Sequence, residues 1–112
     1  MSPDRLPSDW VRAVLPVCIL QAIASGCEAY GYQIIQSLRA SGFDGLSGGT
    51  VYPALNRLEA DGFVHSEWRQ GEAGAGKKFY SLTPRGQERL QETTLEWANF
   101  VDLINNLLHK RG

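Results

Sequence analysis

The sequence predicts an α+β fold that is mainly helical, with three short helices, a two-stranded hairpin and one long C-terminal helix. Apolar residues recur at helical spacing between Trp10 and Leu58, in three segments that end at glycines. Beyond Leu58 the pattern changes to aromatic and β-branched residues at roughly period two, which is typical of strands. After Leu90 an apolar seam advances in steps of three and four residues, which indicates a long helix packed along another helix.

The first helix is predicted to begin at Ser8 or Asp9, either of which can cap it, and to run to about Ser25, just before Gly26. Pro16 lies inside this segment. Because proline removes a backbone hydrogen bond and crowds the preceding turn, we expect it to kink or restart the helix.

The second helix is predicted over residues 30–40, before Gly42. The third lies in "GGTVYPALNRLEADGFV" (48–64) and ends at Gly62. Pro53 is expected within the first turn or so of this third helix, where backbone N–H groups have no helical partner. Helices of these lengths need tertiary packing to persist, so three in sequence imply a compact helical unit.

The hairpin is predicted from "FVHSEW" (63–68) and "KFYSLT" (78–83). The segment that joins them, "RQGEAGAGKK" (69–78), contains three glycines and no large apolar residue. We therefore expect a long, mobile tip with basic residues at both ends.

The last helix is predicted to be capped by Thr83, to have Pro84 at its first position and to continue to about Lys110. At roughly 1.5 Å per residue it extends about 40 Å, more than so small a domain can cover with its own core. Its seam either folds back on the helical unit or packs against another chain, and we favour a homodimer. The residues assigned to dimerisation are Trp97, Val101, Ile104, Leu107 and Leu108.

Composition excludes several classes of protein. The 112 residues, 43% hydrophobic and 21% charged, fit one globular domain, and the start of the chain lacks a secretory signal. No apolar run is long enough to span a membrane, so the expected compartment is the cytoplasm. Cys18 is expected to be a small buried hydrophobe, and Cys27 is a weak candidate for a reactive thiol. With no Ser-His-Asp set, metal-spaced cluster or phosphate loop, we predict no enzyme and no metal or cofactor.

Three helices followed by a hairpin with a glycine-rich tip describe a winged helix-turn-helix. In this architecture the third helix enters the major groove of DNA, and the hairpin lies along the backbone or minor groove. We assign residues 1–83 to this DNA-binding domain and 84–112 to the C-terminal dimerisation helix, which together form one compact unit. Gly48 and Gly49 are expected to let the backbone approach phosphates, and the Thr50 hydroxyl adds a further polar group.

Helical geometry divides the third helix into two faces. The inward face holds Val51, Leu55 and Leu58. The outward face holds Gly49, Pro53, Asn56 and Arg57, with Tyr52 at its margin. Asparagine pairs with adenine, arginine with guanine, and tyrosine hydroxyls hold phosphates, so the outward face is the candidate DNA contact. Two alternatives stay open: Arg57 forms an ion pair with Glu59 or Asp61, or Tyr52 is a partly buried core contact.

Charge is distributed unevenly along the chain. The formal net charge is −1, but residues 69–89 hold five basic and two acidic residues, and three acidic residues follow in the last helix. Such asymmetry can create an anion-attracting surface on a nearly neutral protein. Lys77 and Lys78 are therefore expected to neutralise phosphates.

The chain resembles the PadR family of bacterial transcriptional regulators in four segments that occur in the expected order. They are "YGYQI" (30–34), "GGTVYPALNRLEADGFV" (48–64), "KKFYSLTPRGQERL" (77–90) and "EW" (96–97). Each segment alone is weak, but the set is highly specific and covers most of the chain. The short tail after the hairpin is similar to the compact subgroup, which has a single C-terminal helix.

The resemblance implies a homodimeric repressor that binds inverted-repeat operators and releases them when an effector binds. The positions that match family motifs are Tyr52, Pro53 and Arg57 in the recognition helix, Lys77, Lys78 and Tyr80 in the wing, and Tyr32 in the second helix. Many family wings carry an arginine between the glycine and the basic pair, whereas "GAGKK" offers only lysines. This difference weakens the case for wing insertion into the minor groove, for which arginine is the better residue.

A planar aromatic effector is a further hypothesis. Some compact PadR-like proteins bind drug-like aromatic molecules at the dimer helix, and we assign effector binding to Trp97, Phe100 and Val14. Plain packing of Trp97 in the seam is the alternative. For the whole chain, the rival to a DNA-binding regulator is a winged-helix protein-interaction module. RNA binding comes third, because no aromatic platform on a sheet supports it.

Overall fold

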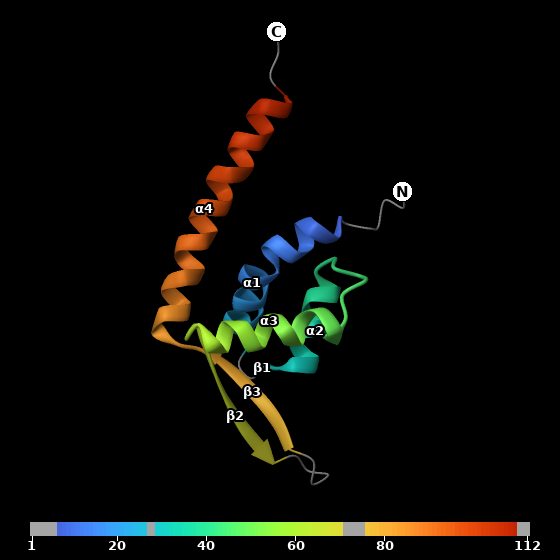
Figure 1. Ribbon diagram of the computed structural model, residues 1–112, viewed down its shortest axis with the longest axis vertical. Coiled ribbons are helices and arrows are strands. Elements are labelled where there is room, and N and C mark those ends of the chain that lie inside the picture. Colours follow the sequence, from blue (N-terminus) through green and yellow to red (C-terminus); the bar gives the residue numbers. More distant parts are fainter. Residues whose placement is uncertain (1–6, 27–28, 71–75, 110–112) are drawn as a thin grey trace.

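The computed structural model describes residues 7–26, 29–70 and 76–109. The elements are α1 (Ser8–Ser25), β1 (Ala29–Tyr30), α2 (Gly31–Ala40), α3 (Gly48–Ala60), β2 (Val64–Gln70), β3 (Gly76–Leu82) and α4 (Pro84–Leu108). Figure 1 shows α1, α2 and α3 gathered into one unit, from which the β2–β3 hairpin and α4 leave in opposite directions. The predicted fold class is confirmed. None of the helices in the described part of the chain is long and apolar enough to cross a membrane.

The sheet has three antiparallel strands in the order β1-β3-β2. The sequence did not predict β1, whose two residues pair Ala29 with Tyr80 and Tyr30 with Phe79. A strand of two residues shows no alternation that could reveal it. β1 forms because residues 29 and 30, just before α2, pair with the free edge of β3.

The hairpin is longer than predicted. The ladder runs from Val64 opposite Leu82 to Gln70 opposite Gly76, so both ends of the glycine-rich segment belong to strands. Cross-strand backbone bonds need no apolar side chain, which explains why a pattern of side chains missed them. The rest of the proposed mobile tip, residues 71–75, lies outside the described residues.

The start of α1 differs from expectation. The residue before the helix is Pro7, without a side-chain cap, so neither Ser8 nor Asp9 takes the capping position. Of the two effects expected of Pro16, a restart is not realised, because the helix continues from Ser8 to Ser25. Pro16 is exposed, so water can bind the carbonyl that its missing N–H leaves unpaired.

The placement of Pro53 in the first turn of α3 was wrong. The N–H groups of Thr50 and Val51 both donate to the Ser47 carbonyl, at 3.1 and 3.0 Å, so α3 begins at Gly48. Pro53 therefore lies in the second turn and removes a bond to the Gly49 carbonyl. Both residues are exposed, so water can replace that bond.

One hydrophobic core joins the three short helices to the sheet. Its buried members are Leu15, Ile19, Leu20, Ile23, Ala29, Ile34, Ile35, Leu38, Leu46, Val51, Leu55, Leu58, Val64 and Tyr80. The predicted inward face of α3 is thus confirmed. Cys18 packs against this core, and burial raises the pKa of its thiol, in agreement with the role of a small hydrophobe. Cys27 lies outside the described residues.

Thr83 joins α4 to the helical unit. As predicted, its Oγ1 accepts a hydrogen bond from the Gly86 N–H, at 3.0 Å, and it also donates to the Gly62 carbonyl, at 2.7 Å. The first turn of α4 is therefore held against the turn that follows α3. The helix ends at Leu108, close to the predicted end at Lys110, which lies outside the described residues.

Candidate nucleic-acid interface

The ring of Tyr52 is seated between two glycines. A Cβ atom on Gly31 would lie 2.4 Å from Tyr52 Cε1, and a Cβ atom on Gly48 would lie 3.0 Å from Tyr52 Cε2. A glycine at position 48 is therefore explained by the space that the Tyr52 ring needs, and not by the approach to phosphate that the sequence suggested. Tyr52 remains 43% exposed, so it is a partly packed side chain at the boundary between α3 and the start of α2.

Gly49 is different. Among the described residues, a Cβ atom there would meet only Ser47 Oγ, at 3.7 Å, so none of them requires a glycine at this position. Thr50, Pro53 and Asn56 are also exposed on α3. These residues keep the outer face of the helix open, as required of a surface that enters a groove of DNA. Tyr32 on α2 is 59% exposed.

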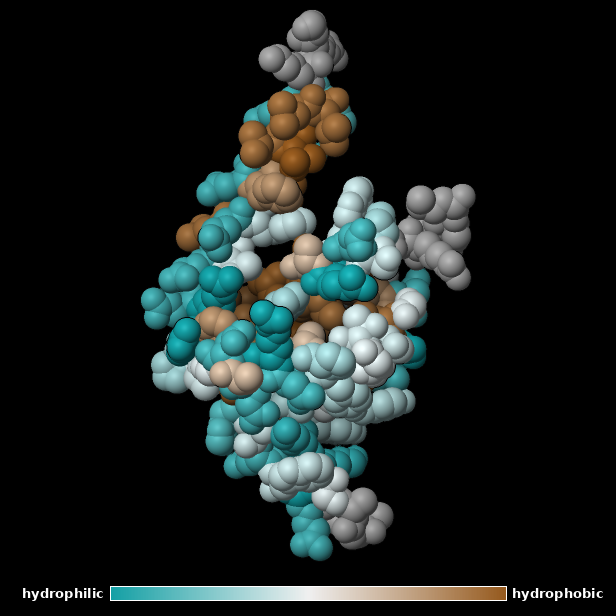
Figure 2. Space-filling view, viewed as in Figure 1, coloured by the Kyte–Doolittle hydropathy of each residue, from teal (hydrophilic) through white to brown (hydrophobic). Residues whose placement is uncertain are grey.

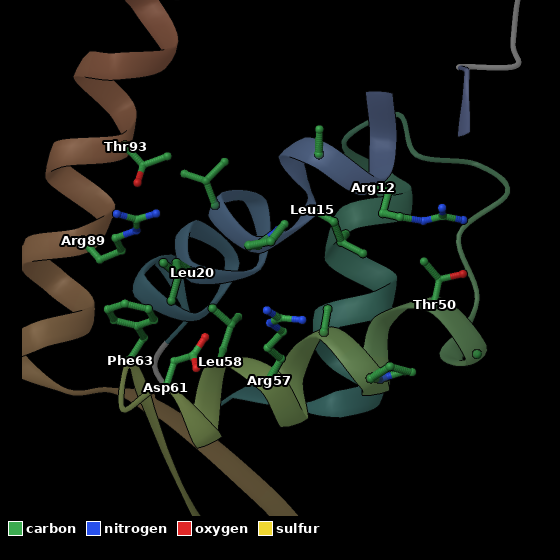
Figure 3. A pocket seen from close by; sticks show the side chains of 16 residues that line it. Arg12, Leu15, Leu20, Thr50, Arg57, Leu58, Asp61, Phe63, Arg89 and Thr93 are labelled. Atoms are coloured by element: carbon green, nitrogen blue, oxygen red, sulfur yellow. The ribbon is translucent and has the colours of Figure 1, made fainter. Parts of the chain in front are cut away.

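Arg57 lies at the margin of the outer face. Figure 3 shows its side chain rising from α3 toward α1. Within the described part of the chain it forms no ion pair with Glu59 or Asp61. The alternative of an ion pair is therefore not realised.

A groove of about 720 Å³ separates α3 from α1 and α4. Apolar side chains line it together with three arginines, Arg12, Arg57 and Arg89, one from each helix. Figure 3 shows Arg89 and Thr93 on the α4 side and Arg12 near the N-terminal end of α3. Among the described residues, the Thr93 hydroxyl is buried without a hydrogen-bond partner. Sequence reasoning missed this groove, because its walls come from three separate segments.

The two wing lysines point to opposite sides of the hairpin. Lys78 Nζ lies 3.3 Å from Glu59 Oε1 on α3, whereas Lys77 Nζ lies 4.4 Å from the ring centre of Tyr30. Successive side chains on a strand alternate between faces, so adjacent lysines cannot share one. The sequence suggests one basic pair, but in the structure Lys78 contacts a carboxylate and Lys77 contacts an aromatic ring.

Glu59 connects the last turn of α3 to both strands of the wing. Its carboxylate accepts a hydrogen bond from Ser66 Oγ on β2 and forms the ion pair with Lys78 on β3. The Ser66 bond and then Lys78 lower the pKa of Glu59, while desolvation partly opposes them. The carboxylate is therefore ionised at neutral pH. The sequence suggests Glu59 only as a partner for Arg57, because its contacts with Ser66 and Lys78 join segments that no local spacing relates.

The opposite face of the hairpin carries an aromatic pair with cations stacked on it. The rings of Tyr30 and Phe79 meet edge to face, with centres 5.5 Å apart. Arg69 lies over Phe79 at 4.4 Å and also pairs with Glu67 at 2.8 Å. Contacts of this kind contribute on the order of 0.5–1 kcal/mol each at exposed sites, so they reinforce the pairing of β3 with its two neighbouring strands.

The predicted seam on α4 is largely exposed in the protomer, and Figure 2 shows apolar surface on the C-terminal half of this helix. The exposed fractions are 47% for Trp97, 53% for Phe100, 36% for Ile104, 64% for Leu107 and 75% for Leu108. Val101 is half-buried, and Leu95 and Leu103 add exposed apolar surface that the seam pattern did not include. The seam therefore does not fold back on the helical unit.

The three effector-binding candidates lie on two helices. The ring centres of Trp97 and Phe100 are 6.1 Å apart on α4, and Val14 is half-buried on α1. The groove near them is lined by other residues, among them Ala13 and Leu15 on α1 and Arg89 and Thr93 on α4.

In the part of the chain that the structure describes, no group of three or more His, Cys, Asp or Glu residues could hold a metal ion.

Comparison with known proteins identifies the family. The model of the transcriptional regulator PadR-like family matches residues 19–92, which span most of the core, α3, the wing and the first part of α4. The chain belongs to this family. Its members are transcriptional regulators rather than enzymes, and membership implies DNA binding.

Individual relatives and solved structures agree with this assignment. The transcriptional regulator Rv3488 of Mycobacterium tuberculosis is 38% identical over 84 residues, which cover 75% of this chain and 76% of that protein. A PadR-like transcriptional regulator from Bacillus cereus is 31% identical, with a TM-score of 0.80 over 92% of this chain and 99% of that one. A PadR family regulator from Eggerthella lenta is 30% identical, with a TM-score of 0.83 over 93% of this chain and 89% of that one.

Proposed function

We propose that this PadR-like regulator binds duplex DNA as a homodimer, recognises an inverted-repeat operator and represses transcription from it. The observation that carries the proposal is the open outer face of α3 beside a hairpin that bears Arg69, Lys77 and Lys78. The helix supplies side chains that can read base edges, and the hairpin supplies cations for phosphates. For this role, we expect the protein to lie in the cytoplasm, together with the DNA that it regulates.

The exposed seam of α4 supports the homodimer. A row of large apolar side chains along one helix is costly to leave in water, and a two-fold axis lets the same row cover its own copy. Two recognition helices related by that axis suit an inverted repeat, whose half-sites lie about one helical turn apart.

DNA binding is tested first by selecting bound duplexes from random oligonucleotides. Lys77→Ala is expected to weaken binding to the selected duplex and to unrelated duplexes equally. It should also reduce the slope of log K against log salt by about one unit. Asn56→Ala or Arg57→Ala is expected to cost about 1–3 kcal/mol and to relax the preference at one base position. Fluorescence anisotropy over a range of salt concentrations measures both effects.

Lys77→Arg keeps the charge and serves as the control for Lys77→Ala, since its salt slope should equal that of the wild type. If the alanine variants keep full affinity and specificity, the assigned face is wrong. A wild-type protein that binds no duplex with a steep salt dependence would instead favour the protein-interaction module.

We further propose that a planar aromatic molecule releases the operator by binding at Trp97. Trp97 and Phe100 form a tilted aromatic pair on the seam, and a two-fold axis there would place Trp97 near its own copy. Val14 on α1 is assigned to the same site. A guest between the two helices would change the spacing of the recognition helices, which couples the guest to DNA binding.

Trp97→Ala is expected to abolish the binding of planar cationic dyes, followed by the anisotropy of the dye's own emission, while the dimer persists. Quenching of tryptophan emission is measured separately in a Trp10→Phe, Trp68→Phe variant, in which Trp97 is the remaining tryptophan and reports alone. Operator release by the same dye, measured by anisotropy, is expected to disappear with Trp97→Ala. If no planar compound binds at micromolar concentrations, or if release survives the substitution, Trp97 is a packing residue.

A further inference from the structure

Trp68 is a large exposed aromatic residue that neither the core nor the α4 seam explains. Its side chain is 71% exposed on β2. A Cβ atom on Gly76 would lie 3.3 Å from Trp68 Cε3, so the indole rests across the β3 backbone at that glycine. The hairpin thus supports one side of the indole and leaves much of its surface open to solvent.

The register of β2 decides which way Trp68 faces. Val64, Ser66 and Trp68 alternate with the other residues of the strand and share one face. Val64 is buried in the core, and Ser66 donates a hydrogen bond to Glu59 on α3. Trp68 therefore lies on the face of the wing that is turned toward the recognition helix. On β3 the residue paired with Trp68 is Lys78, which reaches Glu59 from the same face.

The other face of the wing carries charged side chains that stack on aromatic rings and remain exposed to solvent. There Lys77 and Arg69 stack on Tyr30 and Phe79, whose rings meet each other. The face turned toward α3 differs. Toward the tip of the hairpin, beyond the residues that contact Glu59, it presents the exposed indole of Trp68. This asymmetry points to a partner that lies in the angle between α3 and the wing.

We propose that Trp68 packs against the sugar–phosphate backbone of duplex DNA, with the indole on deoxyribose beside the groove that α3 enters. This inference rests on the proposed DNA binding. A duplex laid along the outer face of α3 passes the wing on the side that Trp68 occupies. Lys78 lies beside Trp68 on this face, and Arg69 and Lys77 on the other face add positive charge to the same narrow hairpin, which suits a polyanion.

An apolar contact with deoxyribose has a signature of its own. It neutralises no phosphate and releases no counterion, so its loss lowers affinity without changing the salt dependence. It also reads no base edge, so the loss is the same for different sequences. Trp68 and Lys77 should therefore behave differently, although both lie on the wing.

The first measurement is the accessibility of Trp68 to acrylamide. The variant Trp10→Phe, Trp97→Phe leaves Trp68 as the single tryptophan. Saturating it with the duplex that the wild type selects is expected to reduce acrylamide quenching at least twofold. The matched control is Trp68→Phe, Trp97→Phe, which leaves Trp10, a tryptophan with the same 71% exposure on α1, and its quenching should not change.

The second measurement is the affinity of Trp68→Ala for that duplex. Packing an indole against sugar removes enough apolar surface from water for a loss on the order of tenfold, with the wild-type salt slope. Trp68→Phe should recover most of the affinity. Because Trp68 is exposed, both variants should keep the wild-type circular dichroism spectrum and melting temperature, which excludes a folding defect as the cause.

The two proposals fail in different ways. If the wild type binds the duplex with a steep salt dependence, yet Trp68 stays fully quenchable and Trp68→Ala keeps full affinity, the Trp68 contact is wrong and the DNA-binding function stands. If Trp68→Ala loses affinity and flattens the salt slope, the residue acts through the charges of the wing, and the sugar contact is again wrong. If the wild type binds no duplex, both proposals are wrong.

Discussion

Replacing both Ile104 and Leu107 with glutamate is expected to convert the dimer into monomers or unfolded chains. Both side chains are exposed on the seam of α4, at 36% and 64%, and the proposed dimer buries them against the second copy. Burying an unpaired carboxylate costs several kcal/mol, and a loss of about 3 kcal/mol already weakens association more than 100-fold. Sedimentation equilibrium should show the mass falling from twice the chain mass to the 12.4 kDa of one chain.

The matched control places the same two charges elsewhere on α4. Asn99 and Asn106 are exposed and lie outside the seam, so Asn99→Glu with Asn106→Glu should leave the dimer mass unchanged. The dimer hypothesis does not survive if the seam variant keeps a dimer mass, or if the wild type is itself a monomer at micromolar concentration.

Replacing Gly86 with alanine is expected to destabilise the fold by about 2–4 kcal/mol. A Cβ atom on Gly86 would lie 1.9 Å from the carbonyl oxygen of Phe63, which is a backbone atom that cannot rotate away. The same carbonyl accepts a hydrogen bond from the Thr83 N–H at 3.1 Å, so the first turn of α4 would have to move off the turn that follows α3. Thermal and urea unfolding measure the loss, which corresponds to a melting temperature lower by roughly 10 °C.

Gly49→Ala is the control for the general effect of replacing a helical glycine. Of the described residues, its Cβ atom would meet only Ser47, at Oγ and 3.7 Å, and alanine is the better helix former, so stability should be unchanged or higher by up to about 1 kcal/mol. A wild-type melting temperature for Gly86→Ala would mean that α4 is not held at Phe63. In that case this contact would not fix the angle between α4 and α3, which sets the spacing of the two recognition helices in the proposed dimer.

Much of the fold could be predicted because its signals are local. The spacing of Val51, Leu55 and Leu58 identified the buried face of α3, and Thr83 with Pro84 marked the start of α4. The apolar steps from Trp97 onward identified the exposed seam. Each of these signals repeats at the period of one helix, so a single segment contains it complete.

The sequence by itself determined the helices, the hairpin, the seam and the outward face of α3. The tertiary structure decided how the candidate site is built: Lys77 and Lys78 lie on opposite faces, Glu59 binds both strands of the wing, and Tyr52 requires glycines at its sides. The reason is physical. A periodic pattern reports which side of an element is apolar, but ion pairs and close contacts depend on distances between segments that only folding brings together.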